Sequence, residues 1–189
     1  MNLPNKLTLL RVFMIPVFVA IFYLTMIPVN YILACVVFAL AAFTDFLDGH
    51  IARKYNLVTD FGKFLDPIAD KVLVSTALIV MLTIPGLFFS LWVAGVCVAV
   101  ILARELIISG FRLVASNKGM VIAADKSGKI KTFLTDVAIV ILLVSLDLTG
   151  SAFDIVNIVG QVAFYLSTIL TVYSGVECII KNKGVIASK

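Results

Sequence analysis

The sequence contains few charged residues. They make up 14% of its 189 positions, whereas soluble domains carry about 25%. The mean hydropathy is high, at +1.15. A soluble chain of this length could not cover so much apolar surface, so lipid must cover it. The sequence therefore predicts an integral membrane protein. Nucleic acid is a poor partner for such a chain, because no soluble domain is left to hold it.

Cysteine and histidine are also scarce. Cys35, Cys97 and Cys178 are scattered along apolar runs without paired spacing, so neither a disulfide nor a thiolate metal site is expected. His50 has no partner histidine or cysteine, which argues against zinc. Any metal chemistry must therefore come from oxygen ligands.

Six apolar runs dominate the chain, and crossing a bilayer takes about 20 residues. They cover roughly residues 7–27, 31–47, 64–84, 91–113, 132–148 and 155–180. Proline or glycine punctuates several of the gaps, and Pro16 should kink the first helix rather than end it. We expect an all-α polytopic membrane protein: one domain over residues 1–189, with six transmembrane helices and a short interfacial segment at its start.

The basic residues predict the orientation in the membrane. All 15 lysines and arginines lie near the two termini, between runs two and three, between runs four and five, or in the helix ends that face those regions. The loops near Pro28, Pro85 and Gly150 contain none. By the positive-inside rule, both termini and the loop after the second run face the cytoplasm. Such a one-sided basic surface can meet anionic lipid or a phosphorylated substrate, although several terminal lysines need do no more than set topology.

Five aspartates lie within residues 45–70, beside hydrophobic runs where a carboxylate is costly. Four of them, with small residues, repeat at the spacing of one helical face. The first series is Asp45, Asp48, Gly49 and Ala52, and the second is Gly62, Asp66 and Asp70. Two antiparallel helices joined by a short loop would bring four carboxylates together at the cytoplasmic edge of the bilayer.

Four neighbouring carboxylates cannot all stay ionised without cations. Two hard divalent ions suit four carboxylates, and the lack of nitrogen and sulfur ligands favours Mg²⁺ or Mn²⁺. Gly49, Ala52 and Gly62 leave room for a ligand or a neighbouring helix, and Arg53 can hold a phosphate with two hydrogen bonds. Helix capping or pairing with nearby cations would explain one or two of these acids but not both series. Asp60 is as easily a solvated loop residue as a ligand contact.

The two series also carry a family signature. Residues 45–53 read DFLDGHIAR and residues 62–70 read GKFLDPIAD, with eight residues between them. They resemble, without departure, the DxxDGxxAR and GxxxDxxxD motif of the CDP-alcohol phosphotransferases, and the six-run layout resembles that family too. The resemblance implies an enzyme that joins an alcohol to the phosphatidyl or phosphoalcohol group of a CDP-linked donor and releases CMP. It also implies a homodimer with a polar cavity facing the cytoplasm.

The resemblance assigns roles to individual residues. It implies that two Mg²⁺ or Mn²⁺ ions are bound by Asp45, Asp48, Asp66 and Asp70. Asp70 is the expected general base on the acceptor hydroxyl. Residues expected to bind the CDP-lipid are Gly49, Ala52, Arg53, Gly62, Asn5 and Thr8.

A second set of basic residues bears on the acceptor. Arg104 and Arg112 lie near one face of the fourth run. An arginine inside a span is costly, so Arg104 is a functional candidate, although pairing with the adjacent glutamate is an equal alternative. With Lys126, Lys129 and Lys131 before the fifth run, these arginines can form a pocket for a phosphate carried by the acceptor.

Three segments narrow the resemblance to a subfamily. ARELIISGFRLVAS (103–116), GKIKT (128–132) and the opening NLPNKLTLLR are similar to bacterial phosphatidylglycerophosphate synthases. The implied reaction transfers the phosphatidyl group of CDP-diacylglycerol to the 1-hydroxyl of sn-glycerol 3-phosphate at the cytoplasmic face of a bacterial cell membrane. Inositol phosphate, serine or phosphatidylglycerol are alternative acceptors. A divalent-cation transporter is a remote alternative, because no polar path continues outward and the second half does not repeat the acidic pattern.

Overall fold

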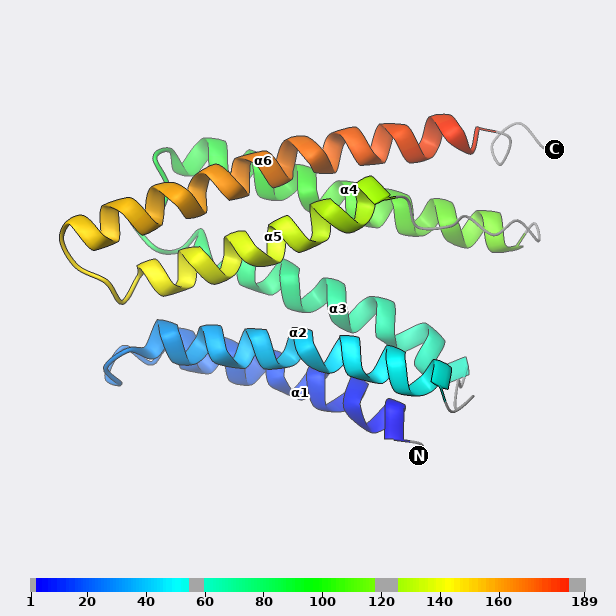
Figure 1. The fold of residues 1–189 in the computed structure, drawn as a ribbon, viewed down its shortest axis with the longest axis horizontal. Coiled ribbons are helices and arrows are strands. Elements are labelled where there is room, and N and C mark those ends of the chain that lie inside the picture. Colours follow the sequence, from blue (N-terminus) through cyan, green and yellow to red (C-terminus); the bar gives the residue numbers. More distant parts are fainter. Residues whose placement is uncertain (1–2, 55–59, 118–125, 184–189) are drawn as a thin grey trace. The chain divides into compact units, whose positions relative to one another are not determined.

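The computed structural model describes residues 3–54, 60–117 and 126–183, which are helices and turns without a strand (Figure 1). Six helices follow one another: α1 (Leu3–Tyr23), α2 (Asn30–Lys54), α3 (Asp60–Met81), α4 (Leu91–Asn117), α5 (Lys126–Ser145) and α6 (Ser151–Lys181). Each apolar run of the sequence falls largely within one of these helices. The prediction of an all-α fold is therefore confirmed.

Within the part of the chain that the structure describes, three helices are long and apolar enough to cross a bilayer. They provide the candidate spans Lys6–Tyr23, Leu91–Ser116 and Ser151–Lys181. In α2 the described apolar stretch is shorter, at Asn30–Thr44. The structure thus supports a membrane protein, while six crossings and the orientation of the termini stay predictions.

The chain packs as two compact units. The first consists of Met1–Leu87 and Val140–Asn157, and the second of Phe88–Ile139 and Ile158–Lys189. Both α5 and α6 contribute residues to each unit. A single catalytic domain over residues 1–189 stays a prediction.

Aromatic side chains pack α1 against α2 in the first unit. Phe18, Phe22 and Phe38 are fully buried. The ring of Phe18 lies 6.0 Å from that of Phe22 and 6.2 Å from that of Phe38, measured between centroids. Tyr31 meets Phe22 edge-on at 5.2 Å. Tilted and edge-to-face rings gain an electrostatic attraction beyond their buried area.

Polar side chains fix the first turn of α2. The Asn30 amide Nδ2 donates a hydrogen bond to the carbonyl of Phe22 at 2.8 Å. The Asp147 carboxylate accepts one from the Ile32 backbone N–H at 2.6 Å. The first N–H groups of a helix have no partner within it, and a carboxylate there also meets the positive end of the helix dipole. Asp147 therefore ties the turn between α5 and α6 to α2.

Helices α1 and α3 both continue through a proline. The segment expected at the interface forms the first turns of α1, which runs through Pro16 to Tyr23. Within these turns Arg11 is fully buried, and its Nε donates to the carbonyl of Ala41 at 3.2 Å. Helix α3 begins at Asp60 and includes Pro67. Residues 62–70 therefore lie on one helix, as the spacing of the second acidic series requires.

The second unit is held by an aromatic contact and a buried polar row. Phe88 and Phe164 lie 5.3 Å apart between ring centroids. The Gln161 side-chain oxygen accepts a hydrogen bond from the Phe89 N–H at 2.9 Å. Further along α6, hydroxyl groups donate to carbonyls of their own helix at 2.7–3.2 Å: Ser167, Thr168, Thr171 and Ser174. Hydroxyls satisfied in this way can be buried on an apolar helix.

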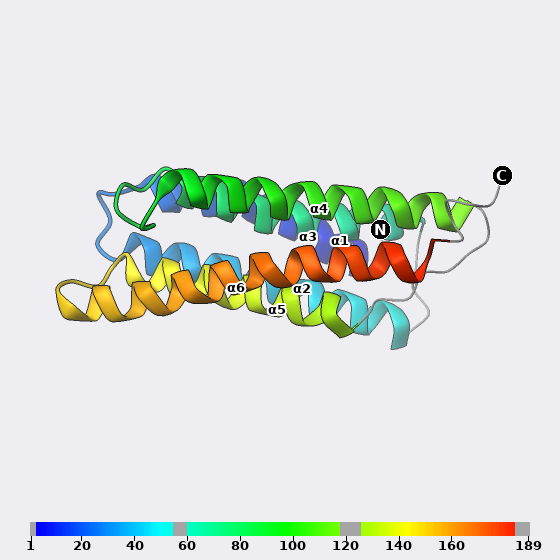
Figure 2. The same ribbon diagram turned by 90° about the horizontal axis from the view of Figure 1, so that it is seen from above.

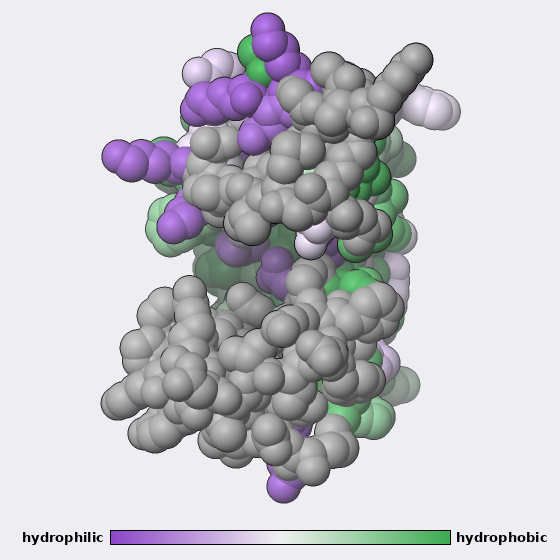
Figure 3. Space-filling model, turned by 90° about the vertical axis from the view of Figure 1, so that its right-hand side faces the viewer, coloured by the Kyte–Doolittle hydropathy of each residue, from purple (hydrophilic) through white to green (hydrophobic). Residues whose placement is uncertain are grey.

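Hydrophilic side chains gather at one end of the second unit. Seen end-on in Figure 3, they cluster in its upper part, beside apolar flanks. The ends of α4 and α6 and the start of α5 lie at this end in Figures 1 and 2. Among the described residues, the exposed cations at this end are Arg112, Lys126, Lys129, Lys181 and Lys183. This gathering agrees with the predicted basic surface.

Candidate active site

The acidic series lie in the C-terminal half of α2 and the N-terminal half of α3, two helices of the first unit. Asp45 and Asp48 belong to α2, and Asp66 and Asp70 belong to α3. In Figure 1 the C-terminal end of α2, the N-terminal end of α3 and the start of α1 all lie at the same end of the first unit. Because both stretches are helical, each series occupies one face of its helix, as predicted.

Three of the four predicted metal ligands, Asp45, Asp48 and Asp66, have side chains outside the described residues. The same is true of four residues assigned to the CDP-lipid: Gly49, Ala52, Arg53 and Gly62. Asp70 is half-buried, one position after the buried Ala69. Among the described side chains no three His, Cys, Asp or Glu residues cluster as metal ligands. The two-metal site stays a prediction supported by helix spacing and donor chemistry.

Of the two CDP-lipid candidates near the start of the chain, Asn5 and Thr8, the structure describes the side chain of Thr8 alone. The Asn5 side chain lies outside the described residues, whereas Thr8 is buried on α1. Thr8 lies one turn before Arg11, which hydrogen-bonds to α2. Here Arg11 has a packing role that its position in the sequence did not indicate.

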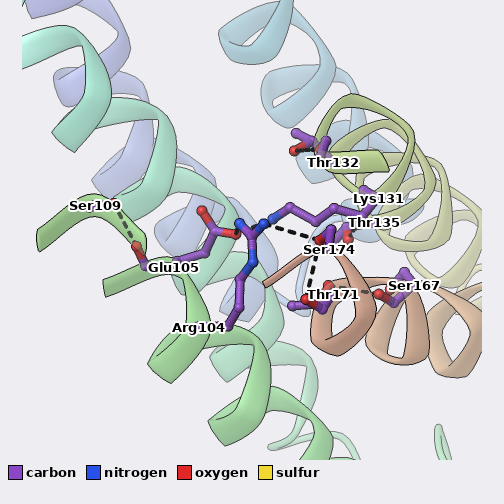
Figure 4. Close-up of polar contacts among 10 residues, drawn as sticks. Arg104, Glu105, Ser109, Lys131, Thr132, Thr135, Ser167, Thr171 and Ser174 are labelled. Carbon is purple, nitrogen blue, oxygen red and sulfur yellow. Dashed lines mark hydrogen bonds and ion pairs between the residues drawn. The ribbon is translucent and has the colours of Figure 1, made fainter. Parts of the chain in front are cut away.

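Two of the five basic candidates, Arg104 and Lys131, contact the same acid in the second unit. The Arg104 Nη1 donates to the Glu105 Oε1 at 3.1 Å, and the Lys131 Nζ contacts the same oxygen. The Arg104 Nη2 donates to the Ser174 hydroxyl at 3.0 Å. Figure 4 shows these side chains from α4, α5 and α6 pointing toward one another. The polar cluster is therefore defined by Arg104, Glu105, Lys131 and Ser174.

The polar cluster lies deep and carries an excess of positive charge. Arg104 follows Leu91 by thirteen positions, which is about 20 Å along an α-helix. The side chains of Lys131, Arg104 and Glu105 are 6%, 14% and 22% exposed. Two cations thus share one carboxylate. The Arg104 Nε is also buried without a hydrogen-bond partner among the described residues, so it has capacity for an oxygen acceptor.

The other three basic candidates lie at the surface. Arg112 is exposed on α4, and Lys126 and Lys129 are exposed in the first turns of α5. The structure therefore brings together Arg104 and Lys131, with the adjacent glutamate that was the alternative partner of Arg104. It does not draw Arg112, Lys126 and Lys129 into the polar cluster.

Helix α6 contributes residues that the sequence pattern did not point to. Ser174 bonds Arg104, and Gly175 lies against the Arg104 side chain. One turn later the Glu177 carboxylate accepts hydrogen bonds from Ser127 and Lys181, both at 2.6 Å. The only signal was local: the stretch SGVE places two small residues before an acid within an otherwise apolar run.

Comparison with known proteins decides the family. The family model described as CDP-alcohol phosphatidyltransferase matches residues 1–173, which includes both acidic series and the polar cluster except for Ser174. The chain belongs to the CDP-alcohol phosphatidyltransferase family. The predicted resemblance is confirmed.

Relatives within this family share one name. A Bacillus subtilis protein named CDP-diacylglycerol–glycerol-3-phosphate 3-phosphatidyltransferase is 41% identical over 193 aligned residues, which cover 96% of this chain and 95% of the relative. Proteins of the same name from Rickettsia bellii and Shigella flexneri are each 40% identical, and each match covers 92% of this chain. They cover 91% and 90% of those relatives. The similarity therefore extends over nearly the whole of each protein.

Proposed function

We propose that the chain is an enzyme that transfers the phosphatidyl group of CDP-diacylglycerol to the 1-hydroxyl of sn-glycerol 3-phosphate. The products are phosphatidylglycerol phosphate and CMP. The observation that carries this proposal is the identity of about 40% to transferases named for this reaction, over nearly the full length of both chains. The intact signature at residues 45–70 supports the same chemistry.

The reaction is a displacement at phosphorus. The acceptor's 1-hydroxyl oxygen forms a bond to the phosphatidyl phosphorus, and the bond from that phosphorus to the CMP oxygen breaks. Asp70 takes the hydroxyl proton, which makes the attacking oxygen more nucleophilic. The electron pair of the broken bond stays on the CMP oxygen, so CMP departs with an additional negative charge on its phosphate. Asp66 and Asp70 lie in the N-terminal half of α3, which suits this role at a membrane edge.

The four signature aspartates fit a pair of divalent ions by the chemistry of their donors. Asp45 and Asp48 on α2, with Asp66 and Asp70 on α3, offer only carboxylate oxygens, which suit Mg²⁺ or Mn²⁺. Such ions, when bound, neutralise the pyrophosphate of the CDP-lipid. Gly49, Ala52, Arg53, Gly62, Asn5 and Thr8 are assigned to the CDP-lipid.

The acceptor phosphate is assigned to the cations of α4 and α5. Arg104 and Lys131 share a single carboxylate, so their charge is only partly compensated. Arg112, Lys126 and Lys129 add exposed positive charge at the cytoplasmic ends of these helices. A dianionic phosphate suits such a group better than serine or phosphatidylglycerol, which would need fewer cations, whereas inositol phosphate carries the same phosphate charge and is distinguished by the assay below.

We place the enzyme in a bacterial cell membrane as a homodimer with its active site facing the cytoplasm. The candidate spans in α1, α4 and α6 support membrane insertion, and the distribution of basic residues supports the orientation. At the membrane edge, acyl tails stay in lipid while the glycerol 3-phosphate stays in water.

Release of CMP by the purified protein tests the proposal. The assay offers CDP-diacylglycerol and Mg²⁺ or Mn²⁺ with one of four acceptors: glycerol 3-phosphate, inositol phosphate, serine or phosphatidylglycerol. Turnover confined to glycerol 3-phosphate is expected. Turnover with another acceptor would still support the metal-dependent transfer from the CDP-lipid, but it would contradict the assignment of glycerol 3-phosphate as the acceptor. If folded protein supplied with metal releases no CMP with any acceptor, the proposed enzymatic activity is wrong and the cation-transporter alternative is favoured.

A further inference from the structure

Arg104 is held from three directions by its neighbours. Its Nη1 bonds Glu105 on its own helix, and its Nη2 bonds Ser174 on α6 at 3.0 Å. Its aliphatic stem crosses Gly175, where a Cβ would lie 3.0 Å from the Arg104 Cγ and 3.4 Å from its Nε. Arginine has many rotamers, so three contacts of this kind greatly narrow the positions available to its guanidinium.

Gly175 is best explained by the close approach of Arg104. Glycine inside a helix is less favourable than alanine, so a mid-helix glycine needs a local reason. On α4, by contrast, a Cβ at Gly95 or Gly110 would meet nothing within 4 Å. At position 175 alanine would push the arginine stem by a few tenths of an ångström. The missing side chain therefore sets how closely Arg104 approaches α6.

Ser174 presents an acceptor to the arginine. Its hydroxyl donates to the carbonyl of Thr171 at 3.2 Å, so its lone pairs are left for the Arg104 N–H groups. Thr171 in turn donates to the carbonyl of Ser167. These bonds fix the direction of the Ser174 hydroxyl, which would otherwise rotate.

We propose that Ser174 and Gly175 are positioning residues, which fix the Arg104 guanidinium so that it meets the phosphate of the acceptor. This inference rests on the proposed function. Neither residue touches the reacting atoms. Both residues act only by positioning Arg104. A change at either position should therefore weaken binding of the acceptor and leave binding of the CDP-lipid unchanged.

Steady-state kinetics of three variants test this role. We expect Gly175→Ala to raise the KM for glycerol 3-phosphate about tenfold, the scale of one weakened charge-assisted hydrogen bond. Ser174→Ala should act in the same direction. In both variants the KM for CDP-diacylglycerol should stay unchanged. Gly95→Ala is the matched control, because it makes the same replacement in open space on α4.

The outcomes separate the two proposals. A thermal midpoint of Gly175→Ala at or above that of the wild type, together with the selective KM rise, supports positioning. Equal rises in both KM values, or no rise in either variant, would overturn the positioning role while leaving the enzyme intact. Wild-type protein that turns over only with an acceptor lacking a phosphate would overturn the proposed acceptor, and the positioning role with it.

Discussion

Lys131 of α5 and Arg104 of α4 reach the same carboxylate oxygen, that of Glu105. Lys131 and Glu105 are 26 positions apart in the chain and belong to different helices. In a largely buried setting, one acid shared by two cations leaves net positive charge, which is costly unless an anion is bound. We therefore expect the stability of the second unit to depend on whether the proposed phosphate is bound.

We predict that Glu105→Gln destabilises the protein by about 2 kcal/mol or more, because both cations lose their shared counter-ion. Glycerol 3-phosphate should then restore much of the lost stability, since its phosphate can compensate the positive charge that the substitution leaves without a counter-ion. Thermal unfolding in detergent, with and without glycerol 3-phosphate, measures both effects. A smaller ligand-induced shift in the variant than in the wild type would contradict the assignment of the phosphate to these cations.

We predict that Asp70→Asn lowers the turnover number by a factor of about 100 or more, the scale of general-base catalysis. The amide cannot take the proton of the acceptor hydroxyl. CMP release at saturating Mn²⁺ and both substrates measures the loss. Asp154→Asn is the control, because Asp154 is exposed in the first turn of α6. Full activity of the Asp70→Asn variant would contradict the assignment of Asp70 as the general base.

Asp45→Ala and Asp66→Ala should each abolish Mn²⁺ binding at micromolar concentrations and, with it, turnover. Each change removes a carboxylate from a site with four, where charge dominates affinity for hard cations. Electron paramagnetic resonance of free Mn²⁺ gives the bound fraction without any assay of activity. Binding that stays at the wild-type level in both variants would place the metal elsewhere.

Arg112→Ala should raise the KM for glycerol 3-phosphate about tenfold with little change for CDP-diacylglycerol, because one charge-assisted phosphate contact is lost. Lys183→Ala, an exposed cation at the end of α6, is the control and should change neither value. Equal changes for both substrates would mean that Arg112 does not serve the acceptor. The test matters because Arg112 lies at the surface rather than in the polar cluster.

Asp147→Ala should lower the thermal midpoint by about 3 °C, the effect of losing one helix cap of about 1 kcal/mol in a chain of this size. The Ile32 N–H would lose the carboxylate that accepts it at 2.6 Å. Asp147→Asn keeps an oxygen acceptor and should lose less. Both KM values should be unaffected, so a selective change in either would reveal a functional role instead.

Much of the protein follows from its sequence alone. Long apolar runs have few stable solutions other than helices in lipid, so composition determined the class and the runs determined six helices. The acidic series were readable because their chemistry lies in residue type and helical spacing, and both are local properties. The course of the chain at Pro67 was not readable: the spacing favours one helix over residues 62–70, whereas a proline disfavours helical geometry at the preceding Asp66, so a kink or a helix that begins near Asp66 was equally open. The structure decided this point, because α3 begins at Asp60 and includes Pro67.

Only the tertiary structure decided which cations meet. Arg104, Arg112 and the lysines of α5 looked alike in the sequence, yet Arg104 and Lys131 are buried around Glu105 while Arg112, Lys126 and Lys129 are exposed. Ser174 and Gly175 gave no strong signal, because a serine and a glycine in an apolar run have many structural explanations. Their role depends on α6 passing close to Arg104, and contacts between helices far apart in the chain depend on side-chain packing that no local pattern encodes.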